Sequence, residues 1–235
     1  MIGPAGRYIC ALVQPRQGYL NGISEMIRNY LFLLLFLAST LTQAQTPRVV
    51  DVPTRTGVTQ RFLLLQPEQA IQAKAAVILF AGGDGGVQLA ADGAMGGMRG
   101  NFLLRTREMF AAQGLAVAVI DAPSDRQMQP FLGGFRQTRE HVEDVKQVIA
   151  WLRSELKLPV WLIGTSRGTQ SAAYISTQLT PADGGPDGLV LTASILLDKR
   201  GRPVPGMALG QLSGSASSFT NGPQCRPGLP LMGSI

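Results

Sequence analysis

Residues 159–173 decide the fold class of this chain, and their sequence is PVWLIGTSRGTQSAA. The run 159–163 is apolar throughout, which is typical of a strand buried on both faces of a parallel sheet. The pattern Gly164-Thr-Ser166-Arg-Gly168 follows directly, and the small residues after it suit a helix that packs closely on the sheet. The stretch therefore predicts a strand, a sharp turn with Ser166 at its apex, and a helix.

The same alternation of elements extends on both sides of this stretch. With 235 residues, of which 45% are hydrophobic and 15% charged, the chain can bury the core of one ordinary domain. Between residues 47 and 196, apolar runs alternate with longer amphipathic stretches, which predicts an α/β domain with a mostly parallel sheet. The predicted strands are 48–52, 59–66, 75–80, 115–120, 159–163 and 189–196. The first two, joined at Thr56-Gly57, suit an antiparallel hairpin at a sheet edge.

Three stretches predict helices, over 101–113, 138–157 and 167–179. In the second, apolar residues recur at helical spacing and charged residues fall between them, so this helix is expected to pack on the sheet. His141 precedes Asp144 by three residues in this helix, and we expect it on the solvent side.

Ser166 is the candidate nucleophile. A serine nucleophile needs a strained turn between strand and helix so that its Oγ projects above the sheet, and glycines two residues to either side let the two elements approach. The alternative is an ordinary strand-to-helix turn without a catalytic duty. The preceding strand, the following helix and a glycine cluster upstream favour the nucleophile.

The glycine cluster is Gly82-Gly83-Asp84-Gly85-Gly86, directly after the predicted strand 75–80. Backbone N–H groups stabilise the alkoxide that develops when a serine attacks a carbonyl, and the groups of Gly82, Gly83 and Arg167 are the candidates for this oxyanion hole. A phosphate-binding loop is the alternative. The cluster lacks both the Gly-Lys-Ser/Thr ending and the Gly-x-Gly-x-x-Gly spacing that such loops use.

Over residues 47–198 the chain resembles the α/β-hydrolase superfamily, and within it the small exported esterases and dienelactone hydrolases. The resemblance rests on the strand and glycine-rich loop at 75–86, the strand ending at Asp121-Ala-Pro, the helix 138–157 and the turn 164–168. It implies a three-layer α/β sandwich with a mostly parallel sheet, C-terminally incomplete, and a catalytic triad in the chain order Ser, acid, His.

The acid and the base of such a triad are the points where the sequence departs from the family. The one histidine, His141, precedes Ser166 and does not fit the family's base position. Asp198, after the sixth predicted strand, is the candidate acid, because Asp183 and Asp187 lie in a turn where Asp bonds the backbone. We therefore expect a serine hydrolase by ancestry, with a small-molecule ester or lactone as substrate and impaired activity. The alternative is a noncatalytic binding or interaction protein on the same fold.

The first 44 residues predict an export signal. Arg28 supplies a positive charge, and the apolar run 30–38 is shorter than the roughly 20 residues that span a bilayer. Thr42-Gln-Ala44 is a small-residue cleavage site, so the product would begin at Gln45 and be periplasmic or secreted. Met26 is then a candidate translation start, with an upstream extension before it. An uncleaved membrane anchor through 30–38 is the alternative.

The predicted domain covers 45–212, and the tail 213–235 differs from it. The tail is rich in Ser, Gly and Pro, and it predicts neither strand nor helix. A frameshift or truncation produces such a loss of periodicity, and so does a genuine disordered terminus.

Composition argues against several other classes of protein. The 21 Lys and Arg against 15 Asp and Glu give a net charge of +6, but the basic residues are scattered singly, so no nucleic-acid partner is expected. One histidine and two cysteines, Cys10 and Cys225, do not suit a zinc or haem site, and no acidic cluster suits calcium. We expect no metal and no cofactor.

Overall fold

The computed structural model describes residues 47–68, 71–197, 204 and 215–219, and backbone alone for the last five. The export signal, the cleavage site before Gln45, Asp198 and most of the tail 213–235 lie outside the described residues, so these predictions stay predictions.

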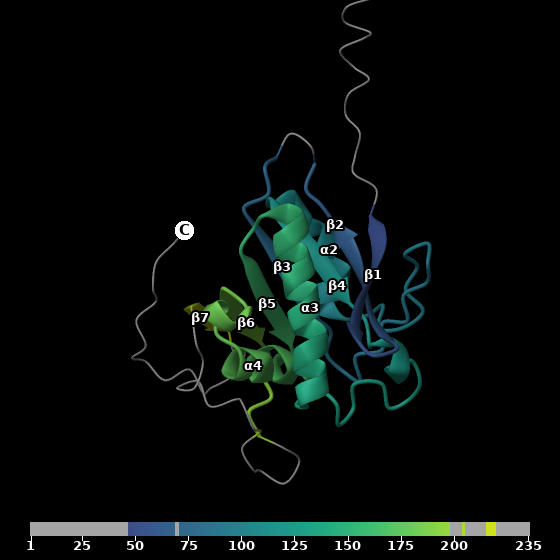
Figure 1. The fold of residues 1–235 in the computed structure, drawn as a ribbon. Helices are drawn as coiled ribbons and strands as arrows, with labels where there is room; N and C mark the ends of the chain where they lie inside the picture. Colours follow the sequence, from purple (N-terminus) through teal and green to yellow (C-terminus); the bar gives the residue numbers. More distant parts are fainter. Residues whose placement is uncertain (1–46, 69–70, 198–203, 205–214, 220–235) are drawn as a thin grey trace, which may run out of the picture. The chain divides into compact units, whose positions relative to one another are not determined.

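The centre of the molecule is a seven-stranded sheet with the order β1-β2-β4-β3-β5-β6-β7 (Figure 1). Its first two strands form the predicted hairpin at one edge, and β2 is also antiparallel to β4. From β4 onward all neighbours are parallel. The strands are β1 Arg48–Arg55, β2 Val58–Leu65, β3 Ala75–Phe80, β4 Leu115–Ile120, β5 Val160–Thr165, β6 Gly188–Thr192 and β7 Ser215–Phe219.

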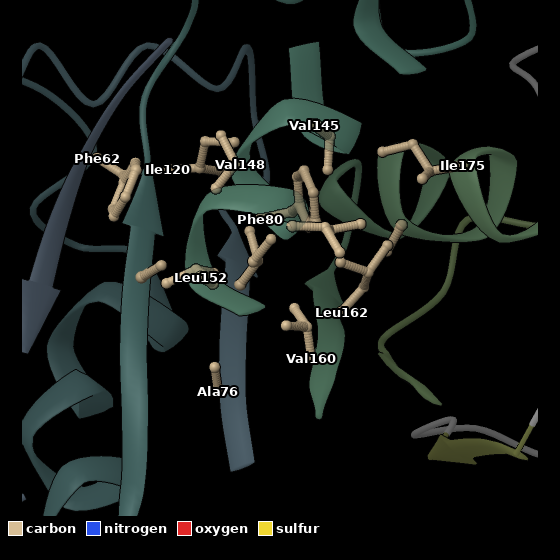
Figure 2. Close-up of a cluster of buried hydrophobic side chains, with 14 of the residues drawn as sticks. Phe62, Ala76, Phe80, Ile120, Val145, Val148, Leu152, Val160, Leu162 and Ile175 are labelled. Carbon is tan, nitrogen blue, oxygen red and sulfur yellow. The ribbon is translucent and has the colours of Figure 1, made fainter. Parts of the chain in front are cut away.

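Helices cover both faces of this sheet, so the predicted three-layer arrangement is confirmed. Helices α3 (Arg139–Leu156) and α4 (Gly168–Gln178) pack with one set of strand side chains, which include Phe62, Ile78 and Leu162. Figure 2 shows Val145, Val148 and Leu152 of α3 beside strand side chains of this cluster. Helix α2 (Phe102–Ala112) packs with the alternate set on the opposite face, because successive strand residues point to opposite sides.

Side chains placed before the helices explain where these begin. The Asn101 side chain accepts a hydrogen bond from the N–H of Leu103 at 3.1 Å, and the Thr138 side chain accepts one from His141 at 3.3 Å. Both satisfy N–H groups that a first helical turn leaves free. Two short 3₁₀ helices, η1 (Ser124–Arg126) and η2 (Pro181–Asp183), lie in the connections.

Three sequence-based expectations are wrong. The sixth strand ends at Thr192 rather than at residue 196, because Ala193 has a φ of 48° and turns the chain away. Ser215–Phe219 form β7 and pair in parallel with β6, although the tail predicted no strand. His141 is 1% exposed rather than on the solvent side, because the buried face of α3 is broad enough to include it with Asp144 and Val145.

Within the described ranges, no helix combines the length and the apolar character needed to cross a bilayer.

Candidate active site

Ser166 occupies the turn between β5 and α4, and its backbone has a φ of 53°. This left-handed conformation is uncommon for a residue with a side chain and is a mark of strained functional turns. The turn is held from both sides. The Ser166 N–H donates to the Thr192 carbonyl at 3.1 Å, and the Ser166 carbonyl accepts from the N–H of Thr169 at 3.1 Å. The side chain is half-buried, at the carboxyl edge of the parallel strands.

The two glycines of the motif are required by close packing. A Cβ at Gly164 would lie 2.7 Å from the Gly168 carbonyl oxygen, and a Cβ at Gly168 would overlap the Phe80 carbonyl oxygen. Strand β3, the turn and the start of α4 therefore pack backbone against backbone. This is the physical reason for the Gly-x-Ser-x-Gly spacing in this chain.

The glycine-rich loop lies beside Ser166, as the sequence predicts. A Cβ at Gly82 would stand 3.0 Å from the Ser166 Cβ and 3.2 Å from the Thr165 carbonyl oxygen. In the described part of the chain, no acceptor binds the backbone N–H of Gly82, Gly83 or Arg167. The N–H groups of the three candidate oxyanion donors are thus free to bind a ligand atom. One of the three residues, Gly82, packs directly against Ser166, the candidate nucleophile.

The remaining glycines of this loop have a different duty. A Cβ at Gly85 would lie 2.6 Å from the Arg136 guanidinium, and one at Gly86 would lie 2.6 Å from the Phe131 ring. The segment before α3 therefore fills the space that these two glycines leave. Arg136 is a site residue that sequence reasoning missed, since a single Arg in an irregular segment carries no pattern.

A cavity of about 130 Å³ borders the turn. Arg136, Arg167 and Gln170 are among the residues that line it, and Arg167 directly follows Ser166. Its volume suits a small group rather than a large substrate.

His141 is not placed to act as a general base toward solvent or substrate. It is buried, its ring lies 5.5 Å from the Phe135 ring, centroid to centroid, and neither ring nitrogen has a hydrogen-bond partner among the described residues. Burial, together with the smaller effects of the positive charges of Arg136 and Arg55, lowers the pKa of His141 to about 3. At neutral pH the ring is uncharged.

The acids near the site are held by structural bonds. Asp183 caps η2 through Thr180, and Asp187 binds Arg153 at 2.6 Å and the Val160 N–H at 2.8 Å. These contacts agree with the expectation that Asp183 and Asp187 are structural. Asp121, at the end of β4, accepts four backbone N–H groups, which fixes the loop that follows the glycine cluster. Asp198, the candidate acid, lies outside the described residues.

No protein-family model matches this chain, and no curated protein matches its sequence. Solved structures match its fold. A structure titled as an alpha-beta serine hydrolase homologue from Coxiella burnetii aligns with a TM-score of 0.50 and 16% identity, over 77% of this chain and 76% of that one. The dipeptidyl peptidase 4 of Porphyromonas gingivalis aligns with a TM-score of 0.52 and 10% identity, over 76% of this chain.

The chain spans 28% of the length of that peptidase. A third match, the structure of DcsB in complex with its substrate analogue, aligns with a TM-score of 0.47 and 20% identity, over 65% of this chain and 46% of that one. At these identities the first two alignments show the fold and nothing finer. The protein has the fold of the α/β serine hydrolases.

Proposed function

We propose that this chain carries the nucleophile and oxyanion hole of a serine hydrolase acting on small esters or lactones. Ser166 is the nucleophile, and the N–H groups of Gly82, Gly83 and Arg167 receive the oxyanion. The observation that carries the proposal is the left-handed turn at Ser166 with Gly82 packed against it. Structural neighbours of the same fold support the superfamily, and the reaction class is inferred from the site.

In the proposed reaction, the Ser166 Oγ attacks the carbonyl carbon of the ester. A C–O bond forms, the carbonyl oxygen becomes an alkoxide, and the free N–H groups stabilise its charge. The alkoxide then collapses, the bond to the leaving alcohol breaks, and water later releases the acid from Ser166. The Oγ proton passes to water or hydroxide, and the leaving alkoxide takes a proton from water to become the alcohol.

The reaction is expected to be slow, because no described residue takes that proton efficiently. His141 is buried with an acidic pKa, and it is the one histidine of the sequence. A serine site with its oxyanion hole but no base loses about three to six orders of magnitude in rate against an intact triad.

The same observation favours a second candidate function, a noncatalytic binding protein. On this hypothesis the Ser166 turn recognises a carbonyl-containing ligand and performs no turnover. The two candidates differ in whether the Ser166 Oγ forms a covalent bond.

A fluorophosphonate probe tests the proposal, because it phosphonylates an activated serine irreversibly. We expect slow, single-site labelling that maps by peptide mass spectrometry to Ser166 and disappears in Ser166→Ala. Ser176→Ala is the matched control, since Ser176 lies in α4, the helix that follows the Ser166 turn, and its hydroxyl donates to the Ala172 carbonyl. Labelling of this variant should equal that of the wild type. Labelling that persists in Ser166→Ala would favour the binding protein. So would a wild type that stays unlabelled after long exposure to the probe.

A further inference from the structure

Arg136 is a buried cation held almost entirely by carbonyl groups. It is 4% exposed. Its Nη1 donates to the Ser171 Oγ at 2.9 Å, and its Nη2 donates to the carbonyl oxygens of Ala81, Gly82 and Gly83 at 3.0, 3.2 and 3.3 Å. In the described ranges no carboxylate forms an ion pair with it. A buried charge is costly unless hydrogen bonds compensate for the lost water. Buried arginines are usually paired with a carboxylate, so an arginine held by carbonyl groups is unusual.

The guanidinium stays charged despite its burial. Desolvation and the positive charge of nearby Arg167, partly offset by the negative charge of Asp84, lower the pKa of Arg136 to about 10. A group with this pKa is protonated at neutral pH. All its carbonyl bonds are therefore charge-assisted, and these are about twice as strong as bonds between neutral groups.

The direction of these carbonyls determines the direction of the N–H groups that follow them. In a trans peptide the C=O of one residue and the N–H of the next point in opposite directions. Three successive carbonyls, from Ala81 to Gly83, converge on Nη2, so the N–H groups of Gly82, Gly83 and Asp84 all point away from Arg136. None of the three has an acceptor in the described part of the chain.

The same guanidinium also reaches the element that carries the nucleophile. Ser171 lies in the first turns of α4, five residues after Ser166, and is fully buried. One rigid, planar fork thus connects the glycine-rich loop with the helix that follows the Ser166 turn. The separation between Gly82 and Ser166 is fixed through this connection as well as through direct packing.

We propose that Arg136 is a positioning residue, which turns the carbonyls of the glycine-rich loop toward itself and so presents the loop N–H groups to the oxyanion formed at Ser166. This inference rests on the proposed function and names the side chain that orients its oxyanion hole. Arg136 does not touch the substrate carbonyl; it acts through the backbone of Gly82 and Gly83.

Arg136→Met tests the proposal, because Met keeps much of the volume and removes all five donors. Arg136→Lys keeps the charge but loses the fork. We expect the second-order rate of Ser166 phosphonylation to fall about 100-fold in Arg136→Met, the cost of misplacing a catalytic group by about 1 Å. Arg136→Lys should recover only part of this loss.

Arg153→Met is the matched control. Arg153 also donates to a backbone carbonyl, that of Gly185 at 2.7 Å, but it lies in the last turn of α3 and does not contact the glycine-rich loop. A merely structural role of Arg136 predicts that both variants lower the midpoint of thermal unfolding and that neither changes the rate of the folded protein.

A second measurement separates this inference from the proposed function. The ¹H–¹⁵N resonances of Gly82, Gly83 and Gly85 should shift in Arg136→Met and stay in place in Arg153→Met. If the wild type is not phosphonylated but these resonances shift, the proposed function fails and the loop-orienting role stands. If the resonances stay in place, or if the phosphonylation rate of Arg136→Met equals that of the wild type, the inference is wrong.

Discussion

Ser166 and Arg136 differ in how far they can be predicted from sequence. The Ser166 turn can be predicted from a local sequence pattern, because the strand, the two glycines and the small residues of α4 all lie within fifteen positions. Arg136 acts over 35 residues to Ser171 and over 55 residues to Ala81. No local sequence pattern predicts a contact over such a distance in the chain, so the role of Arg136 could be identified only from the structure.

His141 shows a related error at the scale of one residue. Its position relative to Asp144 suggested the charged side of a helix, yet both side chains are buried, with Asp144 bonded to Arg55 and His141 left among aromatic rings. Hydrophobic spacing identifies the centre of a buried helix face better than its margins, where polar residues with partners are common.

The buried His141 should make stability depend on pH. Its folded pKa of about 3 lies below the ordinary histidine value of 6.5, so between these two pH values the unfolded chain binds the extra proton. Stability from this residue is complete above about pH 6.5 and is lost as the pH falls, by about 1.4 kcal/mol per unit. His141→Leu, which cannot be protonated, should be more stable than the wild type, and its advantage should grow by about 3 kcal/mol from pH 7.5 to pH 4.

Urea unfolding of both proteins at several pH values measures this difference. The comparison is clean because the sequence has no other histidine. Equal pH dependence in the two proteins would mean that His141 finds water or a hydrogen-bond partner in solution.

Among the elements, the interior strands are predicted best. The ranges 75–80 and 115–120 match β3 and β4 to the residue, because each is a continuous apolar run with a charged residue at one end, Lys74 before the first and Asp121 after the second. The end of β6 is predicted poorly, since the apolar residues 195 and 196 continue the pattern although the chain has already turned at Ala193. Those two side chains pack against the core from outside the strand, and periodicity does not distinguish the two cases.

Helix α3 and strand β1 are joined by a buried carboxylate, which gives a prediction for this pair of elements. Asp144 is fully buried and accepts from the Arg55 Nε at 2.8 Å and from the Thr54 hydroxyl at 2.5 Å. Asp144→Ala should lower the free energy of unfolding by about 2–3 kcal/mol, because Thr54 loses its carboxylate partner and Arg55 keeps the more exposed Asp125 at 3.1 Å. The cost stays below that of a fully buried pair, since the Arg55 side chain keeps 22% exposure.

The ion pair between Arg61 and Asp51 is the control, because it joins β1 to β2 with the Asp51 side chain 44% exposed. Asp51→Ala should change stability by less than about 1 kcal/mol. Chemical denaturation measures both variants. An equal loss in the two would show that burial of Asp144 adds nothing to the bond between α3 and β1.

For the whole molecule, the sequence predicts the layers and not the order of strands in the sheet. Alternating apolar runs and amphipathic stretches imply helices on both faces, as observed for α2 against α3 and α4. That β4 lies between β2 and β3, and that 215–219 add a seventh strand, follows from pairings between distant segments. A Ser-rich stretch such as 215–219 forms a strand here because β6 offers it an edge.

Export is a prediction for the full chain. We propose that residues before Gln45 are removed on export, from the apolar run 30–38 and the small-residue site Thr42-Gln-Ala44. Intact-mass and N-terminal peptide spectrometry of the chain expressed in a bacterium with a general secretory pathway should find a periplasmic product that starts at Gln45. Recovery of an uncleaved product from the membrane fraction would support the anchor instead.

The contact between Gly86 and the Phe131 ring limits the mutational routes open to this protein. A side chain at position 86 collides with a ring contributed from 45 positions away, and one at position 85 collides with Arg136 and Leu132. Neither partner can be enlarged first, and a change at either glycine is tolerated only after the facing segment has already shrunk. Positions 85 and 86 are therefore expected to vary together with 131, 132 and 136 among descendants of this gene, as an epistatic block that drifts slowly while the surface around it changes freely.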